Sequence, residues 1–219
     1  MTLIAERVRS LISQLPNHVE LVAAAKGRTT VEVREAVEAG IETVGENYIK
    51  DARAARETLG SQFKCHFIGR LRAHDVRTSN LALFDMVQSV DSMELAVRID
   101  EKLATLGRTM PVLIEVNSGR ESQKLGVWPE DAEELVRQVA TLSHVRIAGL
   151  MTMGPLMAAR EAYRPCFAET YELFIRLREL GIPGVSMDIL SMGTSDSYEI
   201  AVEEGSTMVR LGTSLFGPR

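Results

Sequence analysis

Short apolar runs rich in β-branched residues recur along the chain, and the segments between them have a different hydrophobic period. The runs have the length of buried strands, whereas the intervening segments repeat their apolar residues with the period of an amphipathic helix. The pattern therefore predicts eight strands that alternate with helices. The strands are expected at VELVAAAK (19–26), TVGEN (43–47), CHFIGR (65–70), MVQSV (86–90), PVLIEVN (111–117), RIAGLMTM (146–153), SMDILSMG (186–193) and MVRLGTSLFG (208–217).

The helical period is clearest in two of the segments between the runs. Residues 130–142 place an apolar stripe on one helix face, and residues 93–106 do the same. Several helices are expected to end at glycines, because glycine adopts the left-handed conformation of a C-cap without strain. These glycines are Gly40, Gly107, Gly181 and Gly205.

Eight strands alternating with helices predict an α/β fold, a single (β/α)8 TIM barrel that spans residues 1–219 as one domain. The chain stops just after the eighth run, so no helix is expected there. The amphipathic N-terminal segment LIAERVRSLISQL (3–15) is expected to fill that vacant place in the outer ring. An open doubly wound sheet is the alternative fold, but no glycine-rich phosphate fingerprint follows the first strand.

Composition and charge narrow the classes of function. The chain of 219 residues has 45% hydrophobic and 25% charged residues, as soluble globular proteins do, and a net charge of −5. A basic face for nucleic acid or an anionic membrane is not expected. The apolar runs are too short to span a bilayer, and the N-terminus lacks the layout of a signal peptide. Cys65 and Cys166 form no ligand spacing, which favours reduced thiols in a cytoplasmic protein and no bound metal.

A barrel of this type places its active site at the carboxyl ends of the strands, so the residues that end each run are the candidates for function. Lys26 ends a run of five apolar residues and is expected to point into the barrel mouth. A lysine that simply extends out to solvent is the alternative for a strand-end position. The other candidates are Glu46, Asn47, His66, Gly69, Ser89, Asn117, Met153, Ser191, Gly193, Ser195, Arg210, Gly212 and Thr213.

The last two strand ends carry residues suited to a phosphate. In SMGTSDSYE (191–199), Ser195 and Asp196 stand where a helix N-cap belongs, and such a turn directs backbone N–H groups at an anion. VRLGTS (209–214) supplies Arg210 for a ring or phosphate oxygen, Gly212 for close approach and the Thr213 hydroxyl. The loops after strands seven and eight are the usual phosphate site of this barrel. Ordinary turn formation is the alternative interpretation.

A lysine that faces a phosphate site across a barrel mouth indicates a phosphorylated aldehyde held as a Schiff base. Pyridoxal 5'-phosphate fits this description, and a Schiff-base aldolase acting on a sugar phosphate would use the same two elements. The residues alone do not separate these two hypotheses.

Motifs over nearly the whole chain resemble the pyridoxal-phosphate homeostasis proteins, the YggS/PROSC family, whose fold is similar to the N-terminal barrel of alanine racemase. The motifs are AAAK (23–26), GENYIKDA (45–52), HFIGRL (66–71), NSGRESQKLGV (117–127), GLMTM (149–153), LSMGTS (190–195) and EEGSTMVRLGTSLFG (203–217). The resemblance implies that Lys26 carries pyridoxal 5'-phosphate and that Asn47 lies near its ring. It also implies that the phosphate is surrounded by Ser195, Arg210, Gly212 and Thr213, and Ser191 and Gly193 are counted with this site.

Three segments depart from the family pattern. The family reads G-x-L-Q-x-N-K after the third strand, where this chain has GRLRAHDVR (69–77), with Arg72, His74 and Asp75. Thr194 replaces a methionine, and Ala25 stands where serine is common; both changes are expected to leave cofactor binding intact. The substitutions at residues 72–75 change the charge of that rim loop, and we expect them to alter any partner binding or cofactor exchange that takes place there.

The expected function is intracellular homeostasis and delivery of pyridoxal 5'-phosphate rather than turnover; an amino-acid racemase is the alternative. Racemases of the related fold use a second base, aided by a separate β domain that has no counterpart after Arg219, and Tyr48 and Tyr198 are the only tyrosines expected near the mouth. Apo pyridoxal-phosphate enzymes are the expected partners, and the expected state is a monomer. Possible secondary site residues are Lys124 and His66, although a solvated loop lysine and a packed histidine are the alternatives; Met151, Met153 and Met157 are expected to fill the barrel.

Overall fold

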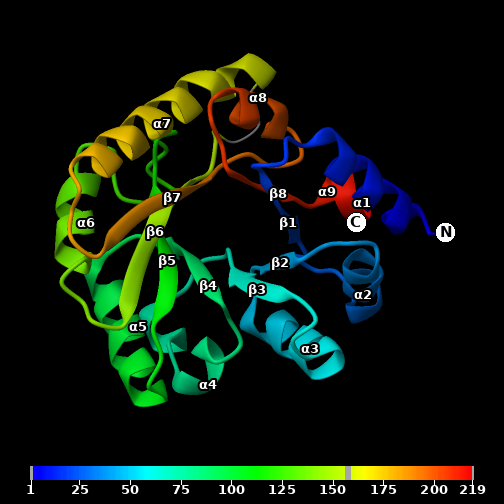
Figure 1. The fold of residues 1–219 in the computed structure, drawn as a ribbon, viewed down its shortest axis with the longest axis horizontal. Coiled ribbons are helices and arrows are strands. Elements are labelled where there is room, and N and C mark those ends of the chain that lie inside the picture. The colour runs from blue at the N-terminus through cyan, green and yellow to red at the C-terminus, as the bar shows by residue number, and fades with distance from the viewer. Residues whose placement is uncertain (1, 156–158, 219) are drawn as a thin grey trace.

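The eight strands form a closed barrel in which every strand is parallel to its neighbours and β8 pairs with β1. The structure, a computed structural model, describes residues 2–155 and 159–218. The strands make a central ring with helices outside it (Figure 1), and the predicted (β/α)8 barrel is confirmed. The strands are β1 Glu20–Ala24, β2 Thr43–Glu46, β3 Lys64–Phe67, β4 Met86–Val90, β5 Met110–Val116, β6 Val145–Thr152, β7 Val185–Ser191 and β8 Met208–Leu211.

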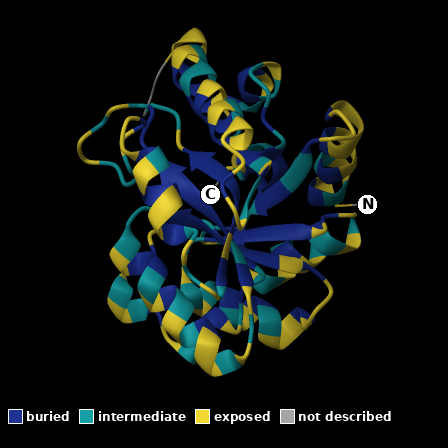
Figure 2. Ribbon diagram, turned by 60° about the vertical axis from the view of Figure 1, so that its left-hand side comes forward, coloured by how far each residue is buried: buried dark blue, intermediate teal, exposed yellow. Residues whose placement is uncertain are grey.

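Helices cover the outside of the barrel; they carry exposed residues on their outer faces, and the strands beneath them are largely buried (Figure 2). In the described ranges no helix is long and apolar enough to cross a membrane. The α-helices are α1 Leu3–Gln14, α2 Thr30–Glu38, α3 Ile49–Leu59, α4 Thr78–Leu81, α5 Met93–Leu106, α6 Ala132–Val139, α7 Arg164–Glu179, α8 Tyr198–Glu203 and α9 Thr213–Phe216, and the short 3-10 helices are η1 Ala73–Asp75 and η2 Arg160–Tyr163.

The prediction that no helix follows the eighth strand is wrong. The strand expected at 208–217 ends at Leu211, and the next residues form the single turn of α9. Gly212 leaves the extended conformation with φ −109° and ψ −77°, and Leu215 and Phe216 then point into the core. Their burial explains why an apolar run longer than a strand continues past the barrel wall.

Helix α1 completes the outer ring, as the sequence predicts. It buries Ile4, Val8 and Leu11 and packs against both α2 and α9. Figure 1 shows this first helix, in blue, beside the red helix at the other end of the chain. The two ends of the chain therefore meet on the same side of the barrel.

The barrel interior has an apolar layer and, nearer the carboxyl ends of the strands, a polar layer. The apolar layer consists of Met86, Leu113, Ala148 and Met151, with Ile189 packed against them. Side chains of a strand alternate between its two faces, so residues two positions apart share a face. The polar layer lies two positions further along β4, β5, β7 and β8, counted from the apolar residues Met86, Leu113, Ile189 and Met208. Its buried side chains are Gln88, Glu115, Ser191 and Arg210.

The three methionines expected to fill the barrel have different surroundings. Met151 is buried and belongs to the apolar layer, as predicted. Met153 is 40% exposed at the barrel mouth, so its prediction is wrong; it follows the last residue of β6, beyond the packed interior. Met157 lies outside the described residues.

A carboxyl group is buried between the barrel wall and α3. Glu46 ends β2 and is 1% exposed, and its Oε2 atom has no hydrogen-bond partner in the described part of the chain. Burial disfavours the charged form and raises the pKa of Glu46 from 4.5 to about 8, and the nearby charge of Asp51 adds to the increase. This carboxyl therefore holds its proton at neutral pH in the folded protein.

The burial of Glu46 predicts a pH-dependent effect of Glu46→Gln on the free energy of unfolding. Between pH 4.5 and about 8 the unfolded chain loses this proton while the folded chain keeps it, so wild-type stability falls as pH rises. Glu46→Gln has no proton to lose at this position. Its free energy of unfolding relative to wild type should therefore increase across that window by up to ~1.4 kcal/mol per pH unit. Urea unfolding of both proteins at several pH values measures this difference.

The control for this experiment is Glu42→Gln, which changes an exposed carboxyl just before the same strand. Its stability difference from wild type should stay nearly constant across the same pH range. Parallel pH profiles for wild type and Glu46→Gln would contradict the assignment of a raised pKa to Glu46.

Candidate functional site

Residues from the carboxyl ends of the strands line a pocket of about 230 Å3 at the barrel mouth. Six residues that the sequence analysis assigned to cofactor binding come together here: Lys26, Asn47, Ser195, Arg210, Gly212 and Thr213. The rest of the lining is Ala24, Arg28, Ile68, Met153, Thr194 and Asp196. The pocket therefore joins the end of β1 to the loops after β7 and β8.

Lys26 is half-buried and directly follows the buried residue Ala25. The backbone turns immediately after it, because Gly27 has a φ of 69° and the Arg28 N–H donates to the Ala25 carbonyl at 2.8 Å. In the described part of the chain, no carboxylate forms an ion pair with Lys26. Its Nζ lies 5.9 Å from the centre of the Tyr48 ring, and the Lys50 Nζ lies at the same distance from that ring.

Asn47 is positioned by a close approach between the ends of β2 and β3. A Cβ atom on Gly69 would lie 2.4 Å from the Asn47 carbonyl oxygen, so only glycine fits beside this segment. The half-buried Asn47 side chain is thereby placed on the wall of the pocket that Ile68 also lines. Gly69 contributes by its small size.

Ser195 joins the two loops that were expected to hold a phosphate. Its Oγ accepts hydrogen bonds from the backbone N–H of Gly212 at 3.2 Å and of Ser214 at 3.0 Å. With both acceptor positions used, its own O–H is free to donate into the pocket. Within the described ranges, the backbone N–H groups of Ser195 and Thr213 have no acceptor. These donors make this end of the pocket suited to an anion.

The expected N-cap role of Ser195 and Asp196 is wrong. Helix α8 begins at Tyr198, and its N-cap residue is Ser197. The residues before it form a turn in which the Ser197 and Tyr198 N–H groups both donate to the Thr194 carbonyl. The turn delays the helix by two residues, which frees the Ser195 hydroxyl for the bonds to the β8 loop.

Arg210 projects from β8 into the barrel, and it is only 3% exposed. Its Nη1 donates to the Ser191 Oγ at 2.6 Å, and its Nη2 donates to the Thr152 carbonyl at 2.9 Å. Burial lowers the pKa of Arg210 to about 10, while the negative charge of Glu115 acts in the opposite direction. The guanidinium therefore stays charged at neutral pH and forms the inner end of the pocket.

His66 and Ser191 lie behind the pocket rather than in its lining. Gln88 connects them: its Nε2 donates to the His66 Nδ1 at 3.0 Å, and its Oε1 accepts from the Ser191 Oγ at 2.7 Å. Burial lowers the pKa of His66 to about 4, so its ring is neutral at physiological pH. His66 is thus a packed, hydrogen-bonded histidine, the alternative considered from sequence.

Gly193 and Lys124 have structural contacts outside the pocket lining. The Gly193 carbonyl accepts from the Arg210 backbone N–H. Gly193 has a φ of 97°, and a Cβ atom added to it would lie 2.6 Å from the Ala201 Cβ, so this position requires a glycine. The Lys124 Nζ donates to the Gly154 carbonyl at 2.7 Å and forms an ion pair with Glu121. Lys124 therefore joins the β5–α6 loop to the segment after β6.

Sequence reasoning missed several residues of the pocket wall. Arg28 lines it and is fixed by an ion pair with Glu32 at 3.1 Å and a bond to the Gly217 carbonyl. Arg28 could have been predicted as a pocket residue because it follows Lys26 by two positions in the same loop. The unusual rim residues Arg72 and His74 are exposed on the β3–α4 loop, and they are not among the lining residues.

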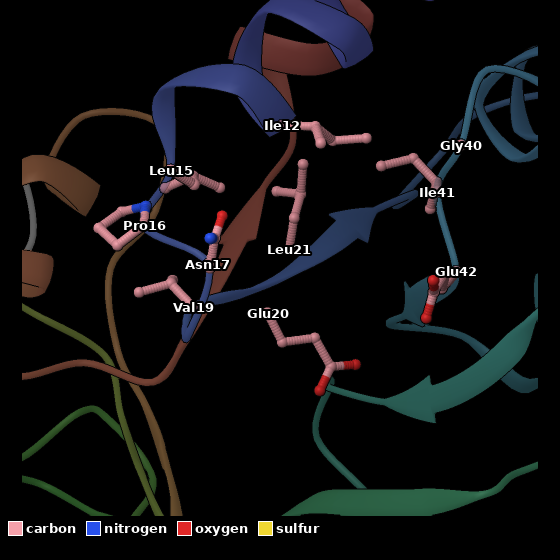
Figure 3. Close-up of a pocket in the computed structure, with 10 residues that line it drawn as sticks. All are labelled: Ile12, Leu15, Pro16, Asn17, Val19, Glu20, Leu21, Gly40, Ile41 and Glu42. Atoms are coloured by element: carbon pink, nitrogen blue, oxygen red, sulfur yellow. The ribbon is translucent and has the colours of Figure 1, made fainter.

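A second pocket, of about 450 Å3, opens at the opposite ends of the strands (Figure 3). Its polar side chains include the carboxylates Glu20 and Glu42, and the remaining lining is mainly aliphatic: Ile12, Leu15, Pro16, Asn17, Val19, Leu21, Gly40 and Ile41. Among the described residues, its lining includes no amine or guanidinium that would bind an anion. The smaller pocket at the mouth is therefore the candidate site, with a lysine amine, free N–H donors and two arginines in one space.

Comparisons with known proteins agree with this geometry. The model of the family "Alanine racemase, N-terminal domain" matches residues 3–219. A pyridoxal phosphate homeostasis protein of Pseudomonas aeruginosa is 34% identical over 230 residues, which cover 100% of this chain and 97% of the relative. One of Aquifex aeolicus is 37% identical, covering 93% of this chain and 88% of the relative.

A solved structure extends this likeness to three dimensions. PipY of Synechococcus elongatus, determined with PLP bound, has a TM-score of 0.89 and 34% identity, and the match covers 98% of this chain and 100% of that chain. The resemblance that the motifs indicated is thereby confirmed. The chain belongs to the alanine racemase N-terminal domain family, and within it to the pyridoxal phosphate homeostasis proteins.

Proposed function

We propose that this chain binds pyridoxal 5'-phosphate covalently through Nζ of Lys26 and holds it for delivery to apo-enzymes that require it, as part of cofactor homeostasis. One observation carries the proposal: a lysine amine without an ion-pair partner in the described chain shares a pocket with the free N–H donors of Ser195 and Thr213. The names of the relatives and the PLP-bound neighbour support it.

The residues present fit this cofactor. When bound, pyridoxal 5'-phosphate supplies an aldehyde that an amine can attack and a phosphate that needs hydrogen-bond donors. Lys26 offers the amine at the end of β1, and the loops after β7 and β8 offer the donors. The cations Arg28 and Arg210 give the pocket a positive charge, which Asp196 offsets only in part.

The two ends of the pocket suit different parts of the cofactor. Ser195 and Thr213 belong to loops beyond the strands, whereas Arg210 lies within β8 and its guanidinium is held inside the barrel. We therefore assign the phosphate to the loop donors and the ring to the side of Arg210. Asn47 lines the pocket at the end of β2, and we assign it to the ring side of the cofactor.

Holding the cofactor fits the pocket better than turnover of an amino acid. Racemisation requires a proton to leave one face of a carbon and to return to the other, which needs two placed bases. Lys26 can serve one face. Tyr48 and Tyr198 are not among the residues that line the pocket, and Tyr48 is 46% exposed. Among the described residues, neither tyrosine is therefore in place as the second base.

Lys26→Ala should abolish covalent loading with pyridoxal 5'-phosphate, because it removes the amine from the pocket. Wild type should gain a visible absorption band whose intensity borohydride reduction removes, leaving a stable adduct detectable by mass spectrometry. Lys50→Ala is the matched control, since Lys50 flanks the same Tyr48 ring. An adduct that survives in Lys26→Ala would overturn the assignment, and trapping only after addition of a sugar phosphate would favour the aldolase alternative.

Ser195→Ala and Arg210→Met should separate phosphate from ring binding. Loss of one bond to a charged group costs ~1.5–3 kcal/mol, roughly tenfold or more in affinity. Ser195→Ala should weaken pyridoxal 5'-phosphate by at least that factor, since it also removes the acceptor of the Gly212 and Ser214 N–H groups. It should leave pyridoxal binding unchanged, whereas Arg210→Met should weaken both. Equilibrium titration of each variant measures this. If Arg210→Met affected only the phosphorylated compound, Arg210 would belong to the phosphate.

If the protein delivers the cofactor rather than using it in catalysis, the loaded protein should not react appreciably with amino acids. The loaded protein, incubated with L-alanine in heavy water, should show little deuterium at Cα and little D-alanine. In parallel, transfer of the cofactor to an apo-enzyme should restore that enzyme's activity. Nuclear magnetic resonance and chiral chromatography measure the first reaction, and the recipient's activity measures the second. Racemisation at enzyme-like rates would establish the racemase alternative, with Tyr48 and Tyr198 as the first residues to test.

A further inference from the structure

Four polar side chains from separate strands form a continuous hydrogen-bonded chain across the barrel interior. His66 on β3 contacts Gln88 on β4 at 3.0 Å, Gln88 contacts Ser191 on β7 at 2.7 Å, and Ser191 contacts Arg210 on β8 at 2.6 Å. None of the four is more than 4% exposed. Water is thus largely excluded from these contacts, and only the Arg210 end reaches the pocket.

The direction of each hydrogen bond in this chain is fixed by the atoms involved. A guanidinium can only donate, so the Ser191 hydroxyl must accept from Arg210. The Ser191 hydrogen then points to the Gln88 Oε1, which leaves the Gln88 Nε2 to donate to the His66 Nδ1 and the Met208 Sδ. A neutral His66 with its proton on Nε2 completes this pattern.

Arg210 depends on such neutral partners, because in the described part of the chain no carboxylate lies within ion-pair distance of its guanidinium. Its other contacts are the Thr152 carbonyl and the Met153 sulfur. A serine hydroxyl rotates freely unless its hydrogen has an acceptor. Without the Gln88 oxygen, the Ser191 hydroxyl would lose the orientation that presents its lone pair to Arg210.

We propose that Gln88 is a positioning residue: it orients the Ser191 hydroxyl as an acceptor and so holds the Arg210 guanidinium at the inner end of the pocket, against the ring of the cofactor. The last clause rests on the proposed function, whereas the positioning of Arg210 does not. Gln88 touches no ligand itself, since it is absent from the pocket lining.

The first experiment tests the positioning without any cofactor. In protein labelled with 15N-arginine, the buried guanidinium of Arg210 should give separate, slowly exchanging Nη resonances, assigned by their loss in Arg210→Lys. Gln88→Met, which keeps the length of the side chain but not its polar atoms, should average these signals and speed their hydrogen exchange roughly tenfold, as expected for loss of a buried bond. Unchanged Arg210 signals in Gln88→Met would overturn the proposal.

Matched variants distinguish positioning from general damage to the barrel. Ser89→Ala alters the next residue of β4, which is 2% exposed and whose Oγ lacks a partner among the described residues, so it should leave the Arg210 signals unchanged. Gln88→Glu keeps an acceptor for Ser191 and should restore them. Ser191→Ala removes the hydroxyl that connects Gln88 to Arg210, by a smaller change in side-chain size. It should have the same effect on the Arg210 signals as Gln88→Met, so the test remains decisive if Gln88→Met misfolds.

A double-mutant cycle tests the connection to the cofactor. Gln88→Met should weaken pyridoxal 5'-phosphate binding roughly tenfold in the wild-type background and have almost no effect in an Arg210→Met background, because its effect passes through Arg210. Additive losses would overturn the proposal that Gln88 acts through Arg210. If wild type itself fails to load, the proposed function is wrong, and the cofactor-free resonances still decide the positioning of Arg210.

Discussion

Pairing of β1 with β8 is the constraint on which the site depends. These two strands lie at opposite ends of the sequence, and their register places Val22 beside Arg210 and Ala23 beside Leu211. Two short extensions of the strands then bring Lys26 into the same pocket as Gly212 and Thr213. An open sheet with the same strands would leave the lysine and the anion-binding loops on separate edges. The closure of the barrel therefore creates the site.

The polar layer inside the barrel shows how a cation is kept in a packed interior. A guanidinium taken out of water needs compensation for its lost hydration. Here the compensation comes from a carbonyl, a sulfur and a hydroxyl rather than from a direct ion pair, with Glu115 acting at longer range. The charge of Arg210 is thus held in place but not neutralised by contact, which leaves it available to a ligand in the pocket.

Much of the fold followed from local patterns in the sequence. Seven of the eight apolar runs match their strands to within three residues, whereas the eighth run extends six residues beyond β8. The strand-end position of Lys26 indicated its place at the mouth, because this position, like the strands, depends on one stretch of chain. The contacts of Arg210 with Ser191 and Thr152 depend on three different strands, and no local period indicates them. The late start of α8 escaped prediction for a similar reason: Ser195 bonds to a distant loop instead of capping its own helix.

The bonds from the β8 loop to Ser195 also have a consequence for the thermodynamics of binding. Gly212 and Ser214 are tied to Ser195 before any ligand arrives, so the two loops behave as one body. A ligand that meets an already ordered site loses less conformational entropy on association than one that must order two independent loops. Conversely, a departure that required the loops to separate would break both bonds at once. Affinity at this end of the pocket is therefore set by the stiffness of the protein as well as by the number of donors it presents.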